Sequence, residues 1–161
     1  MPLTSLLLPG LLLVSASDPR AAVAAVLDDW HRAAASADGP RYFGHMAEEA
    51  VFLGSDGTER WDKRAFQAFA QPHFAKGKGW TFTPTRRAIA WAAGGSVAWF
   101  DEDLASTHMG PCRGSGLLER RDGTWKLLQY NLSVPIPNAL LKDVKAQIAA
   151  HGARSKQVPQ P

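Results

Sequence analysis

Several chemical signatures are missing from this 161-residue sequence, and each absence narrows the range of functions. The single cysteine, Cys112, can form no internal disulfide, and it excludes a structural metal site built from several thiolates. No pair of histidines has the spacing of a metal-binding helix, and neither a phosphate-cradling glycine loop nor a nucleophile elbow occurs. The sequence therefore predicts no metal site and no cofactor.

Positive charge is not concentrated anywhere along the chain. The formal net charge is +3, and the basic residues occur as scattered pairs such as Arg86-Arg87 and Arg120-Arg121. Nucleic-acid-binding proteins usually gather such charge on one face. We therefore expect no nucleic-acid partner. With 45% hydrophobic and 20% charged residues, the composition is that of one ordinary globular domain.

Long apolar runs are also missing. The run at Leu6–Val14 is too short to span a bilayer, and the small residues that follow it are typical of a secretory signal. We expect residues 1–16 to be a signal peptide and the protein to be exported, either to the periplasm or outside the cell. An apolar leader on a cytoplasmic protein is the alternative. The folded domain is then expected at residues 17–152, with a disordered tail at residues 153–161.

Helical patterns come first in the chain. The segment from Asp18 to Gly39 begins with an acidic cap followed by proline, carries one apolar stripe, and ends at glycine. A short helix is expected at residues 40–46. A third helix is expected from Asp62 onward, with a kink or break at Pro72, which lacks a backbone donor.

Extended patterns dominate the second half. After a short hairpin at residues 50–53 and 58–61, strands are expected at residues 80–91, 97–107, 113–121 and 125–135. A last helix is expected between Asn138 and Gly152. This order predicts an α+β fold in which N-terminal helices cover one face of a curved antiparallel sheet. Such a sheet forms a cone whose open end is a pocket, and the six tryptophans and seven phenylalanines suit its core and its walls.

Several stretches resemble the SnoaL-like branch of the nuclear transport factor 2-like superfamily. They are GSDGTERWDKRAF (54–66), SVAWFDEDL (96–104), RGSGLLERRDGTWKLLQYNLSVPIPN (113–138) and the long first helix with Trp30. The resemblance covers about residues 18 to 150. It implies a cone-shaped pocket for a small molecule, often in a homodimer. It does not select a reaction, because the superfamily includes isomerases, cyclases, dehydratases, transport adaptors and binding domains. No acidic residue here matches a family position closely enough to carry over the role of base.

Three acidic residues are candidates for acid/base chemistry: Asp56, Asp101 and Asp103. The last two share one face of the predicted strand, and Glu102 takes the other face with Phe100 and Leu104. Apolar neighbours could raise the pKa of such a carboxyl group toward neutrality, as a general base requires. The alternative is that the strand leaves the core here and these side chains meet water.

Polar and aromatic side chains near the expected pocket are candidates for ligand binding. Arg113 could bind a substrate carboxylate, or it could pair with an acid across the sheet. Gln129 and Asn131 follow Trp125 and Leu127 on one strand face, as in a pocket with a dry tip and a polar mouth. A solvent-facing or dimer-facing row would look the same. The aromatic candidates are Trp30, Trp61 and Trp99, which could equally belong to the core.

Three functions remain open at this point. The first is a small-molecule-binding SnoaL-like domain of unassigned activity. The second is an isomerase, cyclase or hydratase that uses acid/base catalysis. The third is a protein-interaction or dimerisation domain whose sheet face is the contact surface. An enclosed cavity with a buried carboxylate would favour the enzyme, and a cone filled by aromatic rings would weaken both pocket hypotheses.

Overall fold

The computed structural model describes residues 18–155, so the expected signal segment at residues 1–16 and the chain from residue 156 onward lie outside it. The elements in order are α1 (Pro19–Ala35), α2 (Gly39–Gly44), β1 (Met46–Leu53), β2 (Arg60–Asp62), α3 (Lys63–Phe74), β3 (Thr83–Trp91), β4 (Val97–Ser106), β5 (Gly110–Arg121), β6 (Thr124–Ser133), the 3-10 helix η1 (Asn138–Leu140) and α4 (Leu141–Ser155). None of the helices in the described range is both long enough and apolar enough to cross a membrane.

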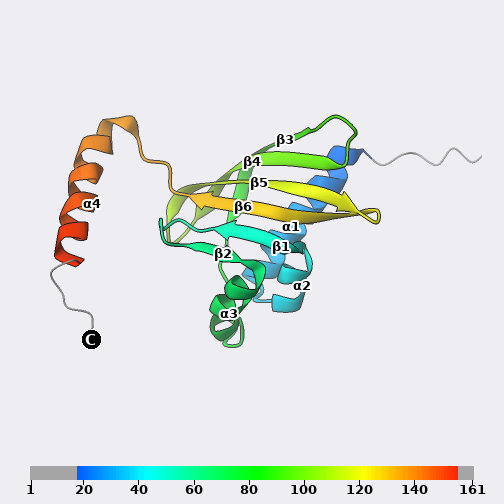
Figure 1. The fold of residues 1–161 in the computed structure, drawn as a ribbon, viewed down its shortest axis with the longest axis horizontal. Coiled ribbons are helices and arrows are strands. Elements are labelled where there is room, and N and C mark those ends of the chain that lie inside the picture. Colours follow the sequence, from blue (N-terminus) through cyan, green and yellow to red (C-terminus); the bar gives the residue numbers. More distant parts are fainter. Residues whose placement is uncertain (1–17, 156–161) are drawn as a thin grey trace, which may run out of the picture.

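The six strands form one curved sheet in the order β2-β1-β6-β5-β4-β3 (Figure 1). Four of its five strand pairs are antiparallel, whereas β1 runs parallel to β6, so the sheet is mixed. A parallel pair joins distant segments and needs no hairpin turn, so it leaves no local signal in the sequence. The β5–β6 hairpin does leave one. Asp122 and Gly123 have φ angles of 49° and 79°, as the predicted type I′ turn requires.

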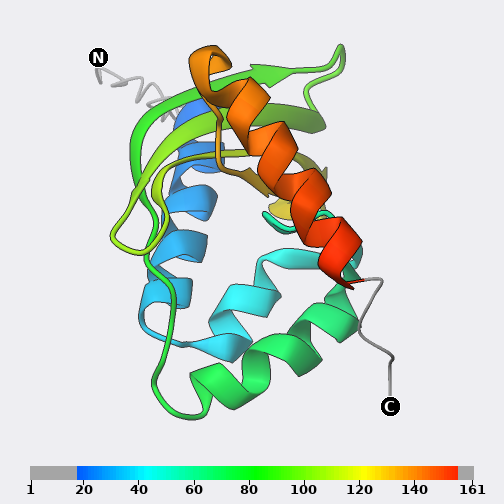
Figure 2. The ribbon, with the colours of Figure 1, turned by 90° about the vertical axis from the view of Figure 1, so that its left-hand side faces the viewer.

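The helices α1, α2 and α3 lie together against one side of the sheet (Figures 1 and 2). Asp18 caps α1 by accepting a backbone hydrogen bond at 2.9 Å, and Pro19 occupies the first turn. The buried stripe of α1 includes Val23, Leu27 and Trp30. The predicted α+β class, with helices on one face and a helix at the C-terminal end, is therefore confirmed.

Two helices run further than their sequences suggest. α3 continues through Pro72 to its end at Phe74, since a proline this close to the end costs one intrahelical hydrogen bond and has little helix beyond it to disturb. α4 continues through Gly152 to Ser155. It stands apart from the sheet, beyond the end of β6, and follows an exposed segment at residues 134–137 (Figure 1).

The core lies between the concave face of the sheet and the three helices, and it is built mainly of rings. Phe52 of β1 stacks on Phe66 of α3 with ring centroids 4.0 Å apart, and Trp30 of α1 stacks on Tyr42 of α2 at 4.8 Å. Such pairs fill the cone from the sides. The space that the sequence analysis assigned to a guest molecule is thus largely occupied by the protein's own aromatic side chains.

The connection between α3 and β3 closes over this core and is held by a close backbone approach. A Cβ atom on Gly79 would lie 2.0 Å from the carbonyl oxygen of Ala34, near the end of α1. Only glycine permits that approach. Trp80 and Phe82 follow at once and extend from this irregular segment into the aromatic core.

Candidate functional site

A fully buried carboxylate lies at the centre of the sheet. Glu102 is on β4 between Phe100 and Leu104, and strand alternation turns all three side chains toward the helices. Glu102 has no exposed surface. Among the described residues, the buried polar and charged side chains are those of His31, Lys63 and Glu102. Since a buried charge is costly unless it is paired, the partners of Glu102 define the site.

Three side chains from three other elements hydrogen-bond to Glu102. His31 Nε2 of α1 lies 2.7 Å from Oε1, Tyr130 of β6 donates its hydroxyl to Oε1 at 3.1 Å, and Arg87 Nε of β3 donates to Oε2 at 2.8 Å. Burial alone would raise the pKa of Glu102, but the hydrogen bond and electrostatic attraction of His31, followed by the charge of Arg87, outweigh it and lower this pKa. The carboxyl group is therefore ionised, and His31 Nε2 must donate.

The neighbouring strand leaves room for this arrangement. Gly114 of β5 is directly opposite Glu102, and a Cβ atom there would lie 2.2 Å from the Tyr130 hydroxyl oxygen. At Gly116 a Cβ atom would lie 2.2 Å from a backbone oxygen of β6 and 2.9 Å from the Phe100 ring. The two glycines therefore serve close packing.

A small cavity of about 10 Å³ adjoins His31 and Tyr130. Trp30 and Tyr42 also line it, and in each of these two a buried polar atom, the indole nitrogen or the hydroxyl oxygen, has no hydrogen-bond partner. Burial raises the pKa of Tyr42 and, with the charge of Glu102, that of Tyr130, so both hydroxyl groups keep their protons. The cavity has room for about one water molecule, and its polar lining suits one.

A second cavity, of about 140 Å³, opens at the rim of the cone and is mostly aromatic. We call it the mouth. Its lining residues are Phe52, Gly54, Ser55, Glu59, Trp61, Phe66, Phe69, Trp80, Phe82 and Leu132. Phe52, Trp80, Phe82 and Leu132 also line the small cavity, so these four side chains separate the mouth from His31. The deep open cone expected from the sequence is thus reduced to two small spaces with rings between them.

The three acids chosen from the sequence lie away from this interior. Asp101 and Asp103 are on the outer face of β4, where their side chains are 47% and 39% exposed and both bind Arg86. Arg86 lowers the pKa of Asp103. Asp56 lies in an exposed turn, where hydrogen bonds from Thr58 lower its pKa. None of the three is desolvated in the way that a base with a raised pKa requires.

The polar candidates for ligand binding are also on the outer face. Arg113 lies 3.6 Å from Asp103 across the sheet, and Gln129 is exposed. The expected row that joins Trp125 and Leu127 to Gln129 and Asn131 is interrupted by a β-bulge at Leu128. The extra residue reverses the alternation, so Tyr130 and Leu132 turn inward instead.

The aromatic candidates divide between the two faces. Trp30 lines the small cavity and Trp61 lines the mouth. Trp99 lies on the outer face of β4, where it is 48% exposed.

Sequence reasoning missed His31, Tyr42 and Tyr130, and it set Glu102 aside. For Glu102 and His31 the sequence does contain a signal, in strand alternation and in helical spacing respectively. Glu102 shares its strand face with Phe100 and Leu104, and His31 is four residues after Leu27 on the buried stripe of α1. For Tyr130 no such signal exists, because the bulge that turns it inward has no clear sequence signature.

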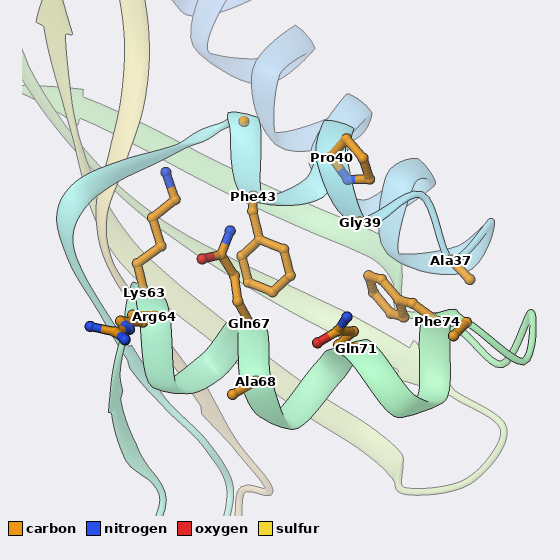
Figure 3. A pocket seen from close by; sticks show the side chains of 12 residues that line it. Ala37, Gly39, Pro40, Phe43, Lys63, Arg64, Gln67, Ala68, Gln71 and Phe74 are labelled. Atoms are coloured by element: carbon orange, nitrogen blue, oxygen red, sulfur yellow. The ribbon is translucent and has the colours of Figure 1, made fainter.

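A hollow of about 830 Å³ forms an open groove between α2 and α3 (Figure 3). Phe43 and Phe74 form its apolar walls, and Gln67 extends into it from α3. Its buried cation, Lys63, donates to the carbonyl oxygen of Met46 at 3.1 Å and is paired with a glutamate. No acid and no histidine lines the groove. Its one buried titratable group, Lys63, is thus already engaged with other protein groups.

In the described part of the chain, no group of three side chains that could ligate a metal ion comes together. The arrangement of these side chains offers proton transfer at His31, with Glu102 holding the imidazole and the Tyr42 hydroxyl as a hydrogen-bond donor.

Replacing Glu102 by Gln should lower the free energy of unfolding by about 3 kcal/mol at pH 7, because it removes the buried charge that pairs with His31 and Arg87 and leaves Arg87 with the more exposed Asp28 as its carboxylate partner. Since the pKa of Glu102 is lowered from 4.5 in the folded state, its stabilising effect is full above pH 4.5 and is lost as the pH falls through the native pKa. The difference between wild type and variant, measured by urea denaturation, should therefore shrink below pH 4.5.

Asp101→Asn is the matched control, since Asp101 is the adjacent acid on the outer face. It should change stability by less than about 1 kcal/mol at every pH. Equal losses for the two variants would contradict the role assigned to Glu102.

Comparison with known proteins identifies the family of this chain and structures with a similar fold. The sequence model of the SnoaL-like domain matches residues 23–137. None of the curated proteins matches the chain. Among solved structures, a nuclear transport factor 2-like protein of unknown function from Pseudomonas putida KT2440 is similar, with a TM-score of 0.61 and 15% identity over 75% of this chain and 91% of that one.

Two further structures resemble the chain to the same degree. A nuclear transport factor 2-like protein from Cytophaga hutchinsonii ATCC 33406 has a TM-score of 0.61 and 13% identity, over 73% of this chain and 99% of that one. A protein described as a candidate scytalone dehydratase from Novosphingobium aromaticivorans DSM 12444 has a TM-score of 0.61 and 10% identity, over 73% and 84%. At these identities the structures establish only a nuclear transport factor 2-like fold, but the sequence model spans most of the chain: the protein belongs to the SnoaL-like domain family.

Proposed function

We propose that this protein binds a small aromatic or apolar molecule at the mouth and that His31 acts on it as a general base and acid. The observation that carries the proposal is the buried His31–Glu102 pair, at 2.7 Å, beside a cavity that adjoins the aromatic mouth. A mostly apolar pocket with a few convergent polar groups is the usual form of a small-molecule site.

Each group then has a defined part in proton transfer. Glu102 accepts the Nε2 proton of His31, which leaves Nδ1 with the lone pair that can take a proton from substrate. The carboxylate also stabilises the imidazolium that forms. Tyr42 keeps its proton, has no hydrogen-bond partner among the described residues and can donate to an oxygen that gains negative charge, whereas Tyr130 donates its hydrogen bond to Glu102 and helps to hold the carboxylate. Such a set suits loss of water from a β-hydroxy ketone, or shift of a double bond next to a carbonyl.

The ligand must displace rings in order to reach His31. Trp80 and Phe82, which separate the two cavities, belong to the irregular connection between α3 and β3 rather than to a helix or strand. Loops move more readily than the elements that they join. The similarity of the fold to the candidate scytalone dehydratase is compatible with dehydration as the reaction class.

Binding at the mouth can be tested with 2-naphthol, a two-ring aromatic alcohol, by native mass spectrometry and tryptophan fluorescence. Trp61→Ala should weaken its binding at least tenfold, because Trp61 lines the mouth and stacks on Phe69 at 4.9 Å. Trp99→Ala, which removes the same ring from the outer face, should leave binding unchanged. Equal effects of the two substitutions would place the ligand elsewhere.

The role of His31 can be tested by following the dehydration of a panel of β-hydroxy aryl ketones through the absorbance of the enone product. His31→Gln should lower kcat by about 10²- to 10⁴-fold, because it removes the proton acceptor while an amide can still donate to Glu102. Binding of 2-naphthol should survive. If wild type turns over no member of the panel yet binds 2-naphthol, the protein is a binding domain without this chemistry.

A second candidate function, association of two copies, is favoured by the outer face of the sheet. Trp99 is 48% exposed. It lies opposite Ala90 of β3 and Leu117 of β5, so the three side chains form an apolar row across three neighbouring strands. A large exposed aromatic side chain of this kind is typical of an interface centre.

We expect Trp99→Glu to convert a homodimer into monomers in sedimentation equilibrium, because it places a charge at the centre of the contact. A chain that is already monomeric as wild type would remove this candidate. Asp101→Asn, close by on the same face, should leave the association state unchanged.

A further inference from the structure

The helix α4 has an apolar face that its own surroundings leave uncovered. Leu141, Val144 and Ile148 are three and four residues apart and so share one side of the helix. Ile148 is 65% exposed and Leu141 is 47% exposed. Apart from η1, no other described element makes extensive contact with α4. An amphipathic helix owes most of its stability to packing of its apolar face, so this helix lacks its main source of stability in the position seen.

The mouth is a second uncovered apolar surface at this end of the molecule. Phe69 of α3 is 46% exposed although it stacks on Trp61, and Trp61 is itself only half-buried. These rings lie beside a cavity of about 140 Å³, and an apolar surface laid over them would remove them from water.

These two surfaces lie at the same end of the protein. α4 crosses in front of the end of the sheet at which β6 finishes (Figure 2). Its last turns lie near the turn between β1 and β2, where the pKa of Asp56 is lowered mainly by Thr58 and in part by His151 of α4. That turn also carries Gly54 and Ser55, which line the mouth.

The segment between β6 and α4 suits a hinge at each of its two ends. Its sequence, Val134–Pro137, alternates two apolar residues with two prolines, and all four are exposed. Proline fixes its own φ and keeps the residue before it extended, so the segment itself is stiff. Rotation is therefore concentrated next to Ser133 and next to Asn138, and the segment acts as an arm of fixed length.

We propose that α4 is a lid that swings about this arm and lays its apolar face, formed by Leu141, Val144 and Ile148, on the mouth of its own chain. A second copy could offer the same surface, but the tether favours the mouth of the same chain. A short linker gives an effective concentration in the millimolar range, well above that of a second chain in dilute solution.

Closure would exclude water from the mouth and from the route to His31. The lid would therefore control access to the proposed site. When closed it would exclude solvent and so strengthen the interaction between His31 and Glu102. The lid is nevertheless independent of that chemistry, because the contact between α4 and the mouth can form with no substrate present.

Disulfide trapping in the full-length protein tests the proposal directly. Phe69→Cys with Ile148→Cys joins the mouth to the apolar face of α4, and mild oxidation followed by peptide mapping should show a disulfide between these two positions within one chain. Cys112 is buried and is distinguished by the mapping. The matched control is Phe69→Cys with Ala150→Cys, because position 150 faces the opposite side of α4.

If α4 closes as proposed, the Phe69→Cys/Ile148→Cys pair should form its intramolecular disulfide at least tenfold faster than the control pair. Equal rates, or no disulfide in either protein, would overturn it. A disulfide between two chains, seen as a dimer on non-reducing gels, would also overturn it, because α4 would then cover the mouth of a second copy. None of these results depends on turnover, so they stand whether or not His31→Gln loses activity.

Discussion

The structure depends above all on keeping one buried negative charge satisfied. Glu102 has no exposed surface, and its three partners come from three elements: His31 from α1, Arg87 from β3 and Tyr130 from β6. An unpaired charge at this depth costs several kcal/mol, so each of these elements is held in a position that meets the carboxylate. One network thereby joins the helical layer to the sheet.

The same network explains why strand β5 has glycines opposite the charged centre. Gly114 leaves space for the Tyr130 hydroxyl, and Gly116 leaves space for the Phe100 ring. Glycine weakens a strand interior when nothing compensates for the missing side chain. Here the compensation is the hydrogen bond from Tyr130 to Glu102, which a larger residue at position 114 would displace.

The rings around the charged centre give it a dry environment and also restrict access to it. Phe52, Trp80 and Phe82 separate His31 from the mouth, and the space beside His31 is about 10 Å³. In such surroundings a hydrogen bond is stronger than in water, and a proton acceptor is protected from solvent. The closed interior and the proposed acid/base role are therefore compatible only if Trp80 and Phe82 move, which their place in an irregular segment allows.

The sequence by itself determined the elements, the fold class and the family resemblance. Capping residues, helical stripes and the Asp122-Gly123 turn are local signals, and each corresponds to what the structure contains, whereas strand alternation holds in β4 and fails in β6 at the bulge. The alternation in β4 also sorted Glu102 from Asp101 correctly. The pattern could not show which face of β4 is buried, because both faces carry an acid and an aromatic residue.

Only the tertiary structure decided the site. His31 and Glu102 are 71 residues apart, and Tyr130 faces them only because a bulge at Leu128 reverses the alternation of β6. The parallel pairing of β1 with β6 is equally non-local. Contacts between distant segments and an extra residue in a strand arise from packing of the whole chain, and packing, unlike capping or turn chemistry, has no short signature in sequence.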